Sequence, residues 1–569
     1  MTNQNQYMNI PAEKFKFTQR TDLSHDKKFD TKPVSYFQGA FRRFCKNKGA
    51  IVGAIVILCL VLFAIIAPAF TPYSPEDYDS VYKYAYPKLP LLAESDISFW
   101  DGCKEKTGVP YLTFLQDYAI AVETGREVIK NGEYTKNEDG SLYSYRFDTY
   151  YGVGFSTYKE LSPAEFEAIQ EYQNRTGRQV LYPVVRLADR PTEEVLKKNA
   201  NLWYKLENPQ AKANKIRPVV DGYDEQGNPI LVPNYWKYEV GQDASVPEYN
   251  SLRIEGEDGV IETTVVIDEN GEVVRDKNGK IVKEEKQYYY SYGQRLTNGN
   301  IQVRAEYYEY YIYMHTEVLK DGISEPVFLF GATETGKDIF GCLAYGARFS
   351  FIFASVVAIV NFVFGVIWGS ISGYFGGTLD LAMERFCEIL GSVPSTIIIT
   401  LLKFHVGQFI LEKGLHQLVD LQSALILFIA FFATGWIGMA GRTRMQFYRF
   451  KNQEYVLAAR TLGASDARIM FKHIFPNGLG TIVTSVALVI PSMIYSETSL
   501  SYLGIINLEA GNLTSVGTLI NAGQKAIQSS VGFVALFPCA FLVLLMLSFN
   551  LFGNGLRDAF NPSLRGSEE

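Results

Sequence analysis

The sequence predicts an α-helical integral membrane protein with six transmembrane helices and an α+β, β-rich domain inserted between the first and the second helix. The mean hydropathy of the 569-residue chain is near zero, but this average combines long apolar blocks with one long polar stretch. Each block is close to the ~20 residues that a helix needs to cross a bilayer. The polar stretch, residues 72–330, is too long for an ordinary loop. The apolar blocks are residues 49–70, 349–371, 383–402, 422–441, 479–497 and 531–552.

The block at 49–70 is expected to be an uncleaved transmembrane helix. It follows a polar segment, residues 1–48, whereas a secretion signal has a shorter apolar core close to the start of the chain. Segment 1–48 is therefore expected to remain on the protein as a cytoplasmic lead.

Basic residues near the ends of the blocks predict the orientation, because such residues stay in the cytoplasm. Four of them, Arg42, Arg43, Lys46 and Lys48, stand directly before or at the start of the first helix. The segment 442–477, between the fourth and fifth blocks, holds seven Lys and Arg against one Glu and one Asp. Both segments, together with the tail 563–569, are expected on the cytoplasmic side, which places residues 72–330 outside.

The polar stretch, called the insert below, is acidic and rich in tyrosine. Residues 72–330 carry a net charge of −14, while the rest of the chain carries +7, and the insert holds 29 of the 37 tyrosines. Tyrosine is common in half-buried strands, where the ring packs and the hydroxyl stays in water. The tyrosine clusters at 288–292 and 307–313 therefore indicate a folded, strand-rich domain.

Local patterns place some elements of the insert. Alternating apolar and polar residues over 261–286, with Asn-Gly at 270–271 and at 278–279, predict a β-meander. A helix is expected over 162–176, where Ser162 and Glu165 form a capping pattern, and another over 191–200.

The insert carries no pattern typical of a catalytic site. His315 is its only histidine, and there is no Cys/His cluster or G-x-S-x-G sequence. Docking or recognition is therefore favoured over catalysis, and neither a bound metal nor a cofactor is expected in this chain. Cys103 and Cys342 could form one disulfide outside the cell; small apolar filling is the alternative.

The stretch GATETGKD at 331–338 resembles the phosphate-binding pattern G-x-x-x-x-G-K-[S/T]. Its last position is Asp338, which cannot supply the hydroxyl that a P-loop offers to magnesium. The predicted topology also places it outside, away from cytosolic ATP. A nucleotide-hydrolysing enzyme is thereby disfavoured, and the stretch is interpreted as the point where the insert rejoins the membrane helices.

The stretch EYVLAARTLGASDARIMFKHIFPN at 454–477 predicts two short helices at an angle. Good helix formers precede Gly463, which breaks the first helix, and Ser465 or Asp466 can cap a second one. Pro476 is expected to end the second helix.

This stretch resembles the cytoplasmic coupling loop, often called the EAA loop, of the membrane subunits of ABC importers. Ala458, Ala459, Gly463 and Pro476 match its pattern, while Leu457 departs from its glutamate. The version in the C-type permease of dipeptide and oligopeptide importers is the most similar. The resemblance extends to YGARFS (345–350), GYFGG (373–377), ETSLSYLGI (497–505) and FNLFGNGLRDAFNP (549–562).

The resemblance implies a type I importer permease in a bacterial cytoplasmic membrane, with the permease core at 331–562. It would pair with a second permease subunit, two cytoplasmic ATPase subunits that bind ATP and Mg, and an extracytoplasmic peptide-binding protein. The substrate would be a peptide, and no nucleic-acid partner is expected. Nickel chelates or another small solute, or a membrane-anchored receptor with an acidic ectodomain, are the alternatives. The coupling residues would be Glu454, Ala458, Ala459, Arg460, Gly463, Ala464, Asp466 and Pro476.

Several residues within the apolar blocks are also singled out. Pro394 and Pro491 are expected to kink their helices or to contact substrate. Glu497 either snorkels to the membrane surface or lines the translocation path, because an ionisable group in a span is costly unless it is wet, paired or facing a cavity. Glu384, Arg385 and Glu388 are expected to form local pairs.

Overall fold

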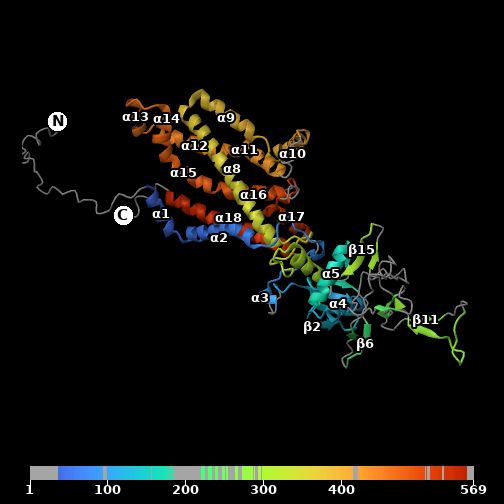
Figure 1. Ribbon diagram of the computed structural model, residues 1–569. Coiled ribbons are helices and arrows are strands. Elements are labelled where there is room, and N and C mark those ends of the chain that lie inside the picture. Colours follow the sequence, from blue (N-terminus) through green and yellow to red (C-terminus); the bar gives the residue numbers. More distant parts are fainter. Residues whose placement is uncertain are drawn as a thin grey trace, which may run out of the picture.

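In the computed structural model the long apolar helices form one bundle, and the polar insert lies at one end of it (Figure 1). The structure describes residues 36–93, 99–154, 157–178, 180–182, 219–224, 229–232, 238–240, 247–249, 252–253, 263–266, 272–285, 287–288, 293–295, 298–413, 421–506, 508, 513–527 and 531–560.

Five helical runs in the described part of the chain are long and apolar enough to cross a membrane. A sixth is present if α9 and α10, which meet at 72°, count as one bent span. The prediction of a multi-pass helical membrane protein is therefore confirmed. The bundle helices are α1 (Tyr36–Lys46), α2 (Lys48–Phe70), α8 (Ile339–Phe375), α9 (Gly377–Gly391), α10 (Ser395–Glu412), α11 (Gln422–Gly435), α12 (Ile437–Phe450), α15 (Phe475–Ala487), α16 (Val489–Tyr502), α17 (Val516–Ile527) and α18 (Phe533–Phe560).

The two prolines singled out in the apolar blocks lie at helix breaks. Pro394 stands in the gap between α9 and α10, where the expected span bends. Pro491 is buried in the first turn of α16, just after α15 ends. Both positions agree with kinking, since a proline cannot donate the backbone hydrogen bond of a helix interior.

The long helix α8 packs against α2, α11, α12 and α16. Its glycines let α12 approach closely: a Cβ built on Gly369 would lie 2.2 Å from the carbonyl oxygen of Ala440. Any side chain there would force the two helices apart, so small residues fix this contact, as is usual between membrane helices.

Residues 103–148 of the insert form a three-stranded antiparallel sheet in the order β1-β3-β2, covered by α4. Phe114 of α4 is fully buried and stacks on Tyr143 of β3, with ring centroids 4.3 Å apart. The elements are β1 (Cys103–Pro110), α4 (Tyr111–Thr124), β2 (Ile129–Lys136) and β3 (Leu142–Asp148).

A second antiparallel sheet has the order β14-β15-β4, with β5 also paired to β15. Its core includes Ile169 of α5, and α5 begins as predicted, with Ser162 and Glu165 forming a capping box. The elements are β4 (Thr157–Leu161), α5 (Pro163–Thr176), β5 (Leu181–Tyr182), β14 (Gly293–Arg295) and β15 (Ile301–Ala305).

Four short strand pairs account for other described parts of the insert. In the predicted meander, β11 pairs with β12 and the Asn278-Gly279 turn is present, with Gly279 at φ +77°. The other predicted turn, at 270–271, and the predicted helix at 191–200 lie outside the described residues. The pairs are β6 (Val219–Tyr223) with β7 (Pro229–Val232), β8 (Tyr238–Val240) with β9 (Pro247–Tyr249), β10 (Leu252–Arg253) with β13 (Gln287–Tyr288), and β11 (Thr263–Val265) with β12 (Lys283–Glu285).

The strand prediction for the tyrosine cluster at 307–313 is wrong, because these residues form the helix α7 (Tyr307–Tyr313). The side chain of Glu306 caps this helix by accepting a hydrogen bond from the backbone of Glu309. Tyr308 and Tyr311, three residues apart, are both buried. Spacing of this kind suits a helix packed against aromatic rings, which the tyrosine content alone does not reveal.

The root of the insert, residues 86–93, 99–103 and 328–330, joins the insert to the bundle. The ring of Tyr86 packs on Phe533 at 4.9 Å between centroids, and Phe330 stacks on Phe537 at 4.0 Å. The indole Nε1 of Trp100 donates a hydrogen bond of 3.0 Å to the carbonyl oxygen of Leu329. The two chain segments that enter and leave the insert are therefore held on the end of α18.

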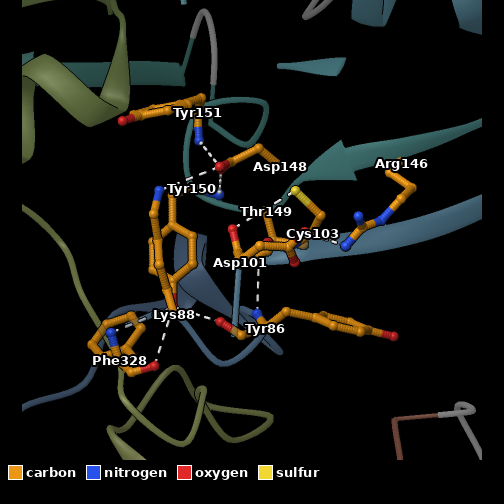
Figure 2. Close-up of polar contacts among 11 residues, drawn as sticks. Tyr86, Lys88, Asp101, Cys103, Arg146, Asp148, Thr149, Tyr150, Tyr151 and Phe328 are labelled. Carbon is orange, nitrogen blue, oxygen red and sulfur yellow. Dashed lines mark hydrogen bonds and ion pairs between the residues drawn. The ribbon is translucent and has the colours of Figure 1, made fainter. Parts of the chain in front are cut away.

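Figure 2 shows the polar contacts between this root and residues 146–151 of the first sheet and its following turn. Lys88 Nζ lies 3.3 Å from Asp148 Oδ2, and both side chains are almost fully buried. The hydroxyl of Tyr150 donates to the carbonyl oxygen of Tyr86 at 2.6 Å. These bonds join the start of the insert to its first sheet, so the sheet and the root form one unit.

Cys103 and Cys342 are both buried and free of a disulfide. Burial raises the pKa of the Cys103 thiol to about 12. The structure therefore favours the filling role over a bridge between these two cysteines.

Candidate functional site at the elbow

The candidate site, called the elbow below, comprises residues 454–476 and lies at the end of the bundle opposite to the insert (Figure 1). It consists of α13 (Glu454–Thr461), α14 (Asp466–Arg468), a π-helical turn over Ile469–Ile474, and the start of α15. The predicted first short helix and the bend at Gly463 are present.

Gly463 makes the bend between α13 and α14. It has φ +80°, a conformation that residues with a Cβ rarely adopt, and a Cβ built there would have open space around it. The backbone N–H groups of Gly463 and Ala464 close the end of α13 by bonding to the carbonyl oxygens of Arg460 and Ala459, at 3.0 and 3.1 Å. Glycine is thus required here for backbone conformation and not for space.

The prediction that Pro476 ends the second helix is wrong. The helical run continues from α14 through the π-helical turn into α15, and Pro476 stands near the start of α15. Directly before it, the N–H of Phe475 bonds to the carbonyl oxygen of Met470, five residues earlier, in the π-helical turn. The altered hydrogen-bond pattern accommodates a residue that has no N–H, so the elbow continues directly into a transmembrane run.

One face of the elbow packs against the bundle. Val456 and Ala459 are buried, together with Ile469 and Ile474, in a cluster that includes Phe447 of α12. The two adjacent alanines therefore differ in burial: Ala459 faces the bundle and is buried, and Ala458 faces away from it and is exposed.

The opposite face carries large exposed apolar side chains. Leu462 is 87% exposed and Phe471 49% exposed, with Tyr455 and Leu457 exposed to similar degrees as Phe471. The remaining predicted coupling residues, namely Glu454, Arg460, Asp466 and Pro476, are also exposed, and Ala464 is half-buried. Exposed apolar groups rimmed by polar ones are typical of a protein-interaction surface.

The elbow is bonded to the end of α8. The hydroxyl of Tyr374 lies 2.5 Å from Asp466 Oδ1, and Arg460 Nη2 donates to the same hydroxyl at 3.4 Å. Just before the elbow, Lys451 Nζ at the end of α12 donates to the carbonyl oxygen of Gly373 at 3.0 Å. A displacement of the elbow would therefore pull directly on α8.

A second polar cluster near the same end joins α8, α9 and α12. The guanidinium of Arg444 makes a two-pronged contact with Asp380, with Nε–Oδ1 and Nη2–Oδ2 distances of 2.6 and 2.7 Å. The hydroxyls of Ser372 and Tyr448 also donate to Asp380. A bidentate arginine–carboxylate pair is geometrically specific, so it fixes the orientation of these helix ends.

The expected local pairing of Glu384, Arg385 and Glu388 is right in part. Arg385 pairs with Glu388 on the exposed face of α9. Glu384 instead lies 2.5 Å from Nη1 of Arg444 on α12, because its side chain faces the neighbouring helix.

Glu497 is fully buried among helices and does not snorkel. Ser350 Oγ of α8 and Ser501 Oγ of α16 donate to its carboxyl at 3.2 and 2.9 Å. Its side chain is 0% exposed, so in this structure it does not line an open path.

The stretch 331–338 forms a packed turn. Asp338 caps α8 by accepting a hydrogen bond of 2.7 Å from the N–H of Gly341. A Cβ built on Gly336 would lie 1.7 Å from the carbonyl oxygen of Asp79, so the turn is pressed against the start of the insert. The glycines thus serve close packing at the junction between the insert and α8.

Sequence reasoning missed Tyr374, Asp380 and Arg444. From the sequence, Arg444 is only one of the seven basic residues of segment 442–477, and Asp380 carries no signal of its own function. The one sequence signal for Asp380 is its place shortly after the glycine pair at 376–377. Its partner Arg444 lies 64 residues away, and no local pattern connects the two residues.

The fold and the elbow define a multi-pass membrane protein with an exposed, partly apolar helical elbow at one end of its bundle. Residues 365–566 match the family model described as binding-protein-dependent transport system inner membrane component. Residues 35–87 match the N-terminal transmembrane domain of oligopeptide transport permease C. Residues 88–364, which include most of the insert, lie between the two matches.

Similar proteins agree with these models. The oligopeptide transport system permease protein OppC of Bacillus subtilis is 42% identical over 236 residues, which are 42% of this chain and 72% of the relative. The dipeptide transport system permease protein DppC of the same organism is 37% identical over 236 residues, covering 42% and 69%. DppC of Lactococcus lactis is 39% identical over 257 residues, covering 45% and 69%. The chain belongs to this family of ABC-importer membrane subunits, as a C-type permease.

Proposed function

We propose that the chain forms half of the translocation path for peptides in an ATP-binding-cassette importer and is moved by cytoplasmic ATPases through the elbow. The relatives named above are oligopeptide and dipeptide permeases, which supports peptides over nickel chelates. In this proposal the chain is non-catalytic, and ATP and Mg are bound by the partner ATPase subunits.

The observation that carries the proposal is the two-sided character of the elbow. Its outer face exposes Leu462 and Phe471, which suit a groove on a protein partner. Its inner face is packed on the bundle through Val456 and Ala459. An ATPase subunit could bind the outer face of such an element, and the inner face would pass the movement of the ATPase on to the bundle.

The transmission would run from the elbow to α8. When an ATPase moves the elbow, the Tyr374–Asp466 hydrogen bond would carry the displacement to the end of α8. The Arg444–Asp380 pair would make α9 and α12 follow, because a bidentate pair resists rotation better than a single contact. The connected helices α8, α9 and α12 would then move together as the bundle switches between an outward-open and an inward-open state.

The proposed orientation places the elbow in the cytoplasm and the insert outside. Support comes from the opposite positions of elbow and insert along the bundle and from the basic residues near the elbow. In this arrangement the termini are cytoplasmic, and the insert lies where an extracytoplasmic peptide-binding protein would dock.

Co-purification tests the assembly. The tagged chain, extracted in mild detergent from cells that express it with its neighbouring transport genes, should bring along a second permease and two ATPase subunits. Replacing Leu462 and Phe471 together by Glu should release the ATPases and keep the second permease. Retention of the ATPases by this variant would overturn the assignment of the elbow.

A further inference from the structure

Glu497 occupies the meeting point of three helical elements near the insert end of the bundle. Ser350 comes from α8, Ser501 comes from α16, and the hydroxyl of Ser515, just before α17, also hydrogen-bonds the carboxyl. Glu497 itself is on α16 and has no exposed surface. One carboxyl group therefore joins three separate pieces of the chain.

The partners of Glu497 are all hydroxyl groups. Among the described residues no Lys, Arg or His makes an ion pair with it. A buried carboxyl without a counter-ion is costly in an apolar bundle unless hydrogen bonds satisfy it. A leucine would fill a similar space without that cost, so the carboxyl is expected to have a role beyond packing.

Small residues bring the backbones together around Glu497. A Cβ built on Gly346 of α8 would lie 2.8 Å from the carbonyl carbon of Ser515. A Cβ built on Gly517 would lie 2.7 Å from the Cα of Thr498 on α16. The start of α17 thus packs directly against α8 and α16, and the hydrogen bonds of Glu497 stabilise this packing.

The other end of α17 leads to the insert. Ala526 of α17 is buried in one cluster with Val531 and Phe533, and Tyr86 of the insert root packs against the same cluster. The helix α17 therefore lies between the Glu497 junction and the root of the insert.

We propose that Glu497 is a positioning residue for transport, which ties α17, and through it the insert, to α8. Movement of α8 is then passed to the insert end of the transporter. This inference rests on the proposed function, in which the elbow moves α8. The hydrogen bonds of Glu497 would then form a second connection, at the end of α8 opposite to the elbow.

The test compares four variants of the assembled transporter. E497Q keeps a side chain that can bond to the serine hydroxyls, E497L removes this ability at similar volume, and S350A removes one hydroxyl. S496A is the matched control, because Ser496 is half-buried and its hydroxyl donates to the carbonyl oxygen of Ser492 within α16, away from Glu497. Hydrogen–deuterium exchange over 513–527 reports the attachment of α17, and the ratio of peptide transported to ATP hydrolysed reports transmission.

E497L should make the amides of α17 exchange about tenfold faster, as expected when hydrogen bonds that hold a local unit are lost. Its transport-to-hydrolysis ratio should fall several-fold, while E497Q and S496A stay near the wild type and S350A lies between. Unchanged exchange and ratio in E497L, or equal damage by E497Q and E497L, would overturn the proposal.

If E497L fails to assemble, S350A and E497Q still test the proposal. S350A must then speed the amide exchange of α17, and E497Q must leave it unchanged. The exchange measurement does not depend on the substrate. Absence of peptide transport by the wild type would refute the proposed function. The amide exchange of α17 would still test whether Glu497 attaches this helix to α8.

Discussion

Tyr374 donates a hydrogen bond of 2.5 Å to Asp466, although the two residues lie 92 positions apart and belong to the end of α8 and the start of α14. This contact joins the elbow to α8, a helix of 37 residues. In the proposed mechanism it is the first step by which ATPase movement reaches the translocation path.

Tyr374→Phe should therefore reduce ATP-driven uptake several-fold while the ATPases stay bound and active. The change removes one hydrogen bond to a carboxylate, of the kind that contributes about 1.5–3 kcal/mol. Uptake and ATP hydrolysis would be measured on the same vesicles. Tyr495→Phe is the control, since Tyr495 lies on α16, outside the elbow, and is 53% exposed; a similar loss in both variants would contradict the prediction.

Gly463→Ala should weaken the elbow by about 1–2 kcal/mol, because φ +80° is unfavourable for a residue with a Cβ. Gly463→Pro should be more severe, since proline cannot adopt this φ and also loses the N–H bond to Arg460. Uptake should fall in the order wild type, Ala, Pro. Gly441→Ala, at a helical glycine with open space around it, should leave uptake unchanged; normal uptake by Gly463→Pro would rule out the coupling role.

Asp380→Ala should lower the free energy of unfolding by about 3 kcal/mol, because it leaves the guanidinium of Arg444 without its main partner. Thermal unfolding in detergent measures this effect. Glu388→Gln is the comparison, since the Arg385–Glu388 pair is exposed on both sides and should contribute almost nothing. Equal stability of the two variants would show that the Arg444 cluster does not hold the helix ends.

Asp338 predicts a pH dependence of stability. Burial raises the pKa of its carboxyl to about 7 from an ordinary value of 3.8, so the folded state binds this proton more tightly than the unfolded chain. The resulting stabilisation is complete below about pH 4 and is lost as the pH rises through about 7. Asp338→Asn keeps a good helix cap and should flatten the dependence of the unfolding temperature between about pH 5 and about pH 8. An unchanged slope would contradict the assignment.

Deleting residues 75–325 should impair peptide uptake and leave the ATPases bound, because the insert lies at the bundle end opposite to the elbow. The deletion also removes Tyr86, whose ring packs on Phe533. Tyr86→Ala therefore separates the effect of the root from that of the whole insert. Full uptake after the deletion, with membrane insertion verified, would show that the insert does not contribute to transport.

The sequence predicts the parts of this structure that depend on local composition. Apolar blocks of about 20 residues reveal the spans, Gly463 reveals the bend, and Ser162 with Glu165 reveals a helix start. The prediction for Pro476 is wrong because a π-helical turn, which has no simple sequence pattern, accommodates this proline within the helical run. The helix at 307–313 was missed because tyrosine composition hides the spacing of the buried rings.

The bonds that hold the candidate site together could not be read from the sequence. Tyr374 with Asp466, and Asp380 with Arg444, join positions 92 and 64 residues apart. Only the packing of α8 against α12 brings these partners together. Glu497 was noticed as an ionisable residue in a span, but its burial depends on where three helices meet.

The most direct test of the central claim is peptide uptake by vesicles that contain the reconstituted transporter. The chain, its second permease, the two ATPases and the binding protein would be assembled, and a radiolabelled peptide offered on the side of the insert, with ATP on the side of the elbow. The account predicts accumulation that requires ATP and is abolished by Gly463→Pro. Accumulation without ATP, or ATP-dependent uptake of a nickel chelate and not of peptides, would contradict it.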